Sequence, residues 1–121
     1  MTYTVIPTDK FLSDIKYYIQ KKNFLHIDDD IEEIVEALEK GKLIGDAISN
    51  VSVAKGNTNK IYKVRAKNSD TNQGKSNGYR VIYYAVTDDA EIYLLTVYNK
   101  KDNNRIPTNK EIADIIRTYC G

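Results

Sequence analysis

The sequence predicts a single α+β domain spanning residues 1–121, with helices and strands packed as layers. Its length suits one hydrophobic core. The 41% apolar and 29% charged residues are ordinary for a globular protein. Segments with helical periodicity lie near both ends of the chain, and runs of β-branched and aromatic residues lie between them. The predicted order is an N-terminal strand, a helix hairpin, a three-stranded antiparallel β-meander and a C-terminal helix.

The first part of the chain is predicted to form one strand and two helices. Residues 3–6 have strand character, and we expect this strand to join the same sheet as the later ones. Apolar residues recur at helical spacing over 8–22. For the second helix, Asp29 and Glu32 have the spacing of a capping pair, and Gly41 marks the end. The two helices therefore form a hairpin with an acidic outer face.

The second part is predicted to form the meander and the last helix. Residues 61–67 alternate between charged and apolar side chains, while 79–86 and 91–98 are apolar on both faces and should be central strands. The connector 87–90 is short enough for a hairpin. A capping box that begins at Thr108 opens the C-terminal helix.

Two intervening segments lack a periodic pattern. Residues 42–59 contain scattered turn formers, so their structure is ambiguous. Residues 68–78 are polar or glycine throughout and are predicted to form a loop.

Several function classes are excluded by composition. The one cysteine, Cys120, excludes an internal disulfide framework. Because His26 is the only histidine, no soft-ligand metal centre is expected. For His26 itself we expect a structural role instead of a catalytic one. The apolar runs are too short to cross a membrane and no secretory signal is visible, so we expect a cytoplasmic protein with no membrane partner. Phosphate-loop, serine-hydrolase and zinc-protease motifs are also missing.

The net charge of +1 hides an uneven distribution. Residues 24–40 are dominated by acids, whereas 51–80 are dominated by Lys and Arg. A localised basic region indicates a site for an anion such as nucleic acid. A mixed, well-solvated surface is the alternative explanation.

The most informative run is 63–67. Strand alternation places Lys63, Arg65 and Lys67 on one face, about 7 Å apart. Stacked like charges favour a bound counter-anion. The alternative is an edge strand whose lysines prevent aggregation.

Arg80 opens an otherwise apolar strand, so its guanidinium needs a carboxylate or a phosphate as partner. The nearby acids Asp88 and Asp89 lie at the far end of that strand, which favours a phosphate. Lys100 and Lys101 follow the next strand, at the same end of the hairpin as Arg80. Whether these side chains share a face depends on strand register, which the sequence leaves open.

Residues 74–84 and 91–100 resemble the RelE/ParE superfamily of bacterial toxins, most closely its RelE-like and HigB-like branches. The shared pattern is a Lys/Arg strand, a strand that begins Gly-Tyr-Arg-Val-Ile-Tyr, and a strand that ends Tyr-X-Lys. The resemblance covers residues 60–100 in motif and the whole chain in the order of its elements.

This resemblance implies the toxin of a type II toxin–antitoxin pair, with a cognate protein antitoxin as its partner. It implies cleavage of mRNA on the ribosome without metal or cofactor, and contact with DNA only through the antitoxin. The RNA 2′-hydroxyl attacks the adjacent phosphate, leaving a 2′,3′-cyclic phosphate and a 5′-hydroxyl. By position, the catalytic cations fall on Lys63, Arg65, Arg80 and Lys100. Further expected RNA contacts are Lys67, Lys75, Tyr79, Tyr98 and Lys101, although the sequence favours packing in the core over base stacking for each of the two tyrosines.

The chain departs from the family pattern in its proton-transfer group. Ile106 stands where RelE carries a tyrosine, and no histidine follows His26. The candidates for proton transfer are therefore Lys63, Tyr98 and Tyr119.

Two other functions fit the same resemblance. One is a ParE-like inhibitor of DNA gyrase, which needs no catalytic cluster, and the other is a catalytically degenerate relative that only binds an antitoxin. In each case we expect the antitoxin to be acidic or amphipathic and to cover Lys63 and Arg65.

Overall fold

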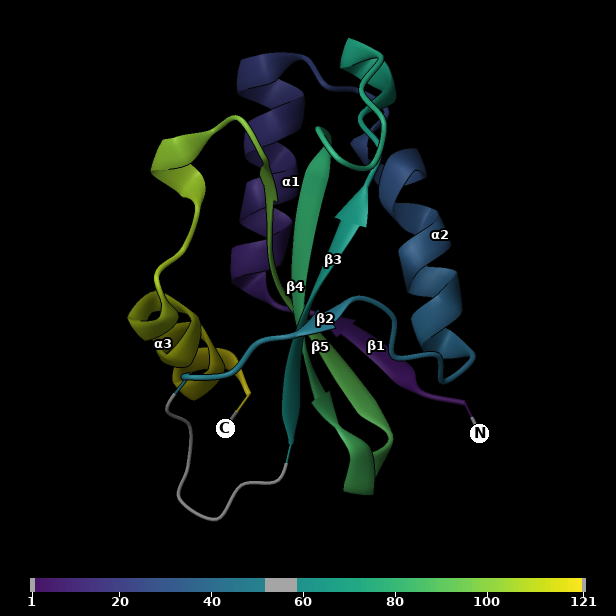
Figure 1. The fold of residues 1–121 in the computed structure, drawn as a ribbon, viewed down its shortest axis with the longest axis vertical. Coiled ribbons are helices and arrows are strands. Elements are labelled where there is room, and N and C mark those ends of the chain that lie inside the picture. Colours follow the sequence, from purple (N-terminus) through teal and green to yellow (C-terminus); the bar gives the residue numbers. More distant parts are fainter. Residues whose placement is uncertain (1, 52–58, 121) are drawn as a thin grey trace.

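The computed structural model describes residues 2–51 and 59–120 (Figure 1). The α+β class and the predicted order of elements are confirmed, and one short strand, β2, is additional. The elements are β1 (Thr4–Pro7), α1 (Asp9–Lys22), α2 (Ile27–Glu39), β2 (Asp46–Ala47), β3 (Lys60–Ala66), β4 (Tyr79–Val86), β5 (Glu91–Asn99) and α3 (Asn109–Tyr119).

The strands form one sheet in the order β1-β5-β4-β3-β2. As expected, β1 joins this sheet, where it pairs in parallel with β5, and the other pairs are antiparallel. Strands β4 and β5 are central because apolar side chains on both of their faces must be buried.

Helices cover the two faces of the sheet unequally (Figure 1). The apolar stripes of α1 and α2 pack on one face, against side chains such as Val64, Tyr83 and Val97. On the other face α3 packs against Ile61, Tyr84 and neighbouring residues. This second face is covered only in part, which leaves room for exposed cations. In the described ranges, no helix has the length and apolar character needed to cross a membrane.

Of the two capping motifs predicted from the sequence, one is confirmed and one is not. The Thr108 capping box opens α3 as predicted, and Thr8, which the sequence analysis did not identify as a cap, caps α1. The proposed capping pair at the start of α2 is wrong, because this helix begins at Ile27, whose side chain is fully buried. Asp29 therefore lies inside the first turn, where its negative charge interacts favourably with the positive end of the helix dipole.

The loop 68–78 is attached to the start of α2. The Ser69 backbone N–H and hydroxyl both donate to the Asp30 carboxylate, at 2.9 and 3.0 Å. The Asp70 carboxylate accepts from the backbone N–H of His26 at 3.0 Å and lies 2.8 Å from its Nδ1. This hydrogen bond and the charge of Asp70 raise the pKa of His26. The single histidine therefore holds a loop, consistent with the structural role expected for it.

Candidate functional site

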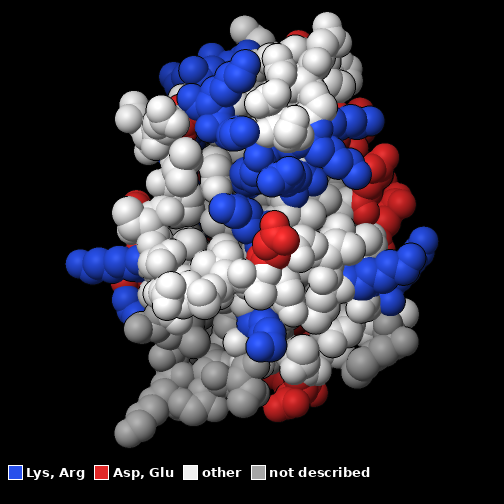
Figure 2. Space-filling view, viewed as in Figure 1, with Lys and Arg blue, Asp and Glu red and all other residues white. Residues whose placement is uncertain are grey.

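The four cations predicted to be catalytic line one cavity of about 370 Å³. We call it the cation cavity, and its lining residues are Asp46, Lys63, Arg65, Arg80, Tyr98, Lys100 and Ile106. It opens on the sheet face that α3 covers only in part. Figure 2 shows Lys and Arg side chains gathered across this side of the molecule, with acidic side chains along the edge on the side of α2.

Strand β3 supplies two of the cations. Lys63 and Arg65 are exposed, whereas Val64 and Ala66 between and beside them are buried against the helices. This is the two-residue period of a strand with one face covered. In the ladder, Arg65 lies directly opposite Arg80 of β4. The register between β3 and β4, which the sequence alone does not determine, thus places the guanidinium groups of Arg65 and Arg80 next to each other.

Arg80 has a different environment from the one expected. The residue is 7% exposed, and its guanidinium donates to three backbone carbonyls, those of Lys75 at 3.1 Å, Ser76 at 3.0 Å and Tyr79 at 3.2 Å. Carbonyls satisfy hydrogen bonds but do not neutralise charge. Burial lowers the pKa of Arg80 and the neighbouring Arg65 lowers it further, while Tyr98 has the opposite effect. Of the two partners expected for Arg80, no carboxylate of the described residues pairs with it; the loop carbonyls hold the side chain without neutralising it, and a phosphate partner stays a prediction.

Strand β5 supplies Tyr98, and Lys100 follows directly after its end. Tyr98 lies opposite Arg80 in the ladder and is 4% exposed. Burial raises the pKa of its phenol, although the charge of Arg80 works against this. The backbone N–H of Lys100 donates to the Gly78 carbonyl at 2.9 Å, which fixes the chain where it passes the cavity.

The cation cavity carries a positive excess. It holds four cations and one carboxylate, that of Asp46. Among the residues that the structure describes, none of these five side chains takes part in an ion pair. Four cations with a single carboxylate among them repel one another, so an anion that enters this cavity relieves the repulsion. The arrangement is suited to binding a phosphate group.

Two residues of the cavity were missed in the sequence. Asp46 lies in the segment without a periodic pattern, and its strand has only two residues, too few for a pattern to appear. Ile106 was noted only as a departure from the RelE pattern. It lines the cavity with 43% of its surface exposed, so the place expected for a tyrosine is in the site but holds no titratable group.

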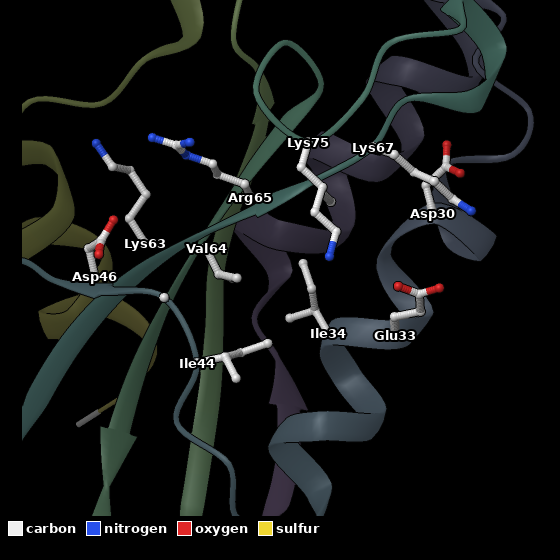
Figure 3. A pocket seen from close by; sticks show the side chains of 12 residues that line it. Asp30, Glu33, Ile34, Ile44, Asp46, Lys63, Val64, Arg65, Lys67 and Lys75 are labelled. Carbon is white, nitrogen blue, oxygen red and sulfur yellow. The ribbon is translucent and has the colours of Figure 1, made fainter.

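A larger hollow of about 600 Å³ lies between α2 and β3, and we call it the α2 groove. It shares Asp46, Lys63 and Arg65 with the cation cavity. Figure 3 shows Lys75 pointing into it above the apolar side chains of the groove, with Lys67 close to the start of α2. Two of the predicted RNA contacts, Lys67 and Lys75, therefore lie beside the cation cavity.

The remaining predicted contacts lie elsewhere. Tyr79 is fully buried on the sheet face covered by α1, where its ring packs against Tyr18 and Phe24. It cannot stack on a base, so its assignment to RNA binding is corrected: it is a core residue. Lys101 lines a separate hollow of about 250 Å³ together with Tyr18 and Phe24. Tyr119, a candidate for proton transfer, is on α3 and does not line the cation cavity.

The chain is similar to solved structures, whereas the sequence comparisons find no match. No protein-family model and no curated protein matches the chain. A solved structure, the archaeal RelE-RelB complex from Pyrococcus horikoshii OT3, is similar with a TM-score of 0.40 and 23% sequence identity. The alignment covers 84% of this chain and 99% of that chain.

Proposed function

We propose that this chain is the toxin of a type II toxin–antitoxin pair and that it cleaves mRNA on the ribosome. The observation that carries the proposal is the convergence of Lys63, Arg65, Arg80 and Lys100 on one cavity. The sequence pattern alone points to these four positions, without any information on strand register. Their meeting in space is what a phosphate-binding catalytic site requires.

The chemistry follows from the charge of the cavity. When the 2′-oxygen attacks the neighbouring phosphate, the non-bridging oxygens gain negative charge in the pentacoordinate transition state. The facing guanidinium groups of Arg65 and Arg80 are placed to stabilise this charge. By analogy with oxyanion-hole donors, each such contact contributes on the order of 3 kcal/mol. In this proposal, the chain's own cations supply the electrostatic stabilisation of the reaction.

The proposed antitoxin covers the same face. Exposed Lys63 and Arg65 form a basic surface on the sheet that an acidic or amphipathic segment can neutralise. Such a segment would block the phosphate site and cover the charge at once. The acids of α2 lie along another edge (Figure 2), so they do not repel a substrate or partner at the cation cavity.

Arg65 offers a cleaner test than Arg80. Because Arg80 holds the loop through Lys75 and Ser76, removing it also disturbs the backbone. Arg65 is exposed, and its side chain makes no hydrogen bond or ion pair with any described residue. Arg65→Ala should lower the rate of mRNA cleavage on the order of 100-fold without affecting stability. Cleavage is measured by primer extension on an mRNA under translation, with and without ribosomes.

The control is Lys16→Ala, which removes an exposed cation from α1. We expect this variant to cut like the wild type. Cuts that need both ribosomes and Arg65 support the proposal. If Arg65→Ala cleaves mRNA at the same rate as the wild type, Arg65 does not stabilise the phosphate in the reaction. A wild type that leaves mRNA intact while it inhibits DNA supercoiling by gyrase would replace the proposal with the ParE-like function.

A further inference from the structure

The cation cavity supplies many donors but few groups able to accept a proton. Attack by a 2′-hydroxyl requires a base that takes its proton. Lysine and arginine side chains carry only donors when charged. The raised pKa of Tyr98 keeps its phenol protonated, so this residue is also a donor. Ile106 contributes no titratable group.

Asp46 is the one carboxylate that lines the cation cavity among the described residues. Strand β2 pairs with β3 so that Asp46 lies directly opposite Lys63. Figure 3 shows the two side chains next to each other on the same side of β3. Asp46 is exposed and forms no ion pair with any described residue, so its oxygens are open to a ligand.

The backbone before Asp46 is held close to β3 by Gly45. This glycine has a φ of +99°, a conformation that other residues rarely adopt. A Cβ atom at this position would lie 2.5 Å from the carbonyl oxygen of Lys63 and 2.9 Å from the Cβ of Val64. Because Gly45 has no side chain, its backbone can approach β3 this closely, and this holds Asp46 of β2 at the rim of the cavity.

We propose that Asp46 is the general base of the cleavage reaction, an assignment that rests on the proposed function. One carboxylate oxygen accepts the proton of the 2′-hydroxyl while the 2′-oxygen forms its bond to phosphorus. The bond from phosphorus to the 5′-oxygen breaks, and the leaving oxygen takes a proton from water. Asp46 later returns its proton to solvent, so atoms and charge balance over the cycle. Asp46 thereby takes the proton-transfer role for which the sequence offered only Lys63, Tyr98 and Tyr119 as candidates.

The test is the isosteric Asp46→Asn variant, assayed in single turnover on mRNA-programmed ribosomes at increasing toxin concentration. Loss of the base should lower the maximal rate constant on the order of 100-fold. The half-saturating concentration should stay equal or fall, because the variant removes a negative charge that repels phosphate. A residue that only helped substrate binding would instead raise the half-saturating concentration and leave the maximal rate unchanged.

The matched control is Asp88→Asn, an exposed aspartate at the far end of β4, which should behave like the wild type. Thermal unfolding of Asp46→Asn, compared with the wild type, reports on the fold. If the wild type cuts and Asp46→Asn cuts at the same maximal rate, the role of Asp46 is overturned while the proposed function stands. If the wild type cuts nothing, both fall.

Discussion

At the scale of single residues, the buried carboxylate of Asp14 links α1 to the sheet and to the segment after β5. It is fully buried and accepts hydrogen bonds from Lys10 at 2.5 Å, Thr96 at 2.5 Å and Arg105 at 2.8 Å. The Arg105 guanidinium also lies 3.7 Å from the centre of the Tyr17 ring. This cluster fixes the stretch between Lys100 and Ile106, which borders the cation cavity.

Removing this carboxylate should be costly. Asp14→Ala leaves the Thr96 hydroxyl and the Arg105 guanidinium without their partner, and breaking a buried charge pair in this way costs about 3 kcal/mol of the free energy of unfolding. Lys10→Ala is the control, because Lys10 is partly exposed and the loss should stay below about 1 kcal/mol. Chemical denaturation measures both. Equal losses in the two variants would show that Asp14 is not the centre of the cluster.

At the scale of elements, the face on which each side chain lies was only partly predictable. Alternation in β3 correctly placed Lys63 and Arg65 together, because the strand is regular. In β5, strict alternation would place Tyr98 on the same face as Ile92 and Leu94. Instead, a β-bulge shifts the register, so that Tyr98 belongs to the opposite face. A bulge leaves no mark in the residue pattern, so the tyrosine of the cavity could not be placed from the sequence.

The junction between the loop 68–78 and β4 depends on Gly78. A Cβ atom there would lie 2.2 Å from the Ala66 carbonyl oxygen and 2.9 Å from the Asn68 nitrogen, both rigid backbone. The Gly78 carbonyl also accepts from the N–H of Lys100. Any displacement of this glycine therefore moves a residue of the cation cavity.

Gly78→Ala should accordingly destabilise the protein by about 2 kcal/mol, since overpacked sites must shift their backbone. Gly74→Ala is the matched control in the same loop, because a Cβ at Gly74 meets nothing within 4 Å. We expect its effect to stay within about 1 kcal/mol. The midpoints of thermal or urea unfolding give the comparison. A Gly78→Ala variant as stable as Gly74→Ala would contradict the close packing described here.

At the scale of the whole molecule, the fold separates opposite charges that nearly cancel in the sum. The acids of α2 lie on one side and the cations of β3 and β4, with Lys100 after the end of β5, on another, so a net charge of +1 coexists with a strongly basic face. The sequence predicted this separation and the order of elements. It did not predict β2 or Asp46, because a two-residue strand is defined only by its pairing with β3.

The central claim is that Lys63, Arg65, Arg80 and Lys100 form one site for an RNA phosphate. The most direct measurement is an amide NMR titration of the chain with a short single-stranded RNA whose 2′-oxygens are methylated, so that it cannot be cleaved. We expect the largest shifts to map to these residues and to Tyr98 and Asp46 around the cation cavity, and we expect Arg65→Glu to abolish them. Shifts confined to the separate hollow at Lys101, or a titration that Arg65→Glu leaves unchanged, would show that these cations do not form a phosphate site.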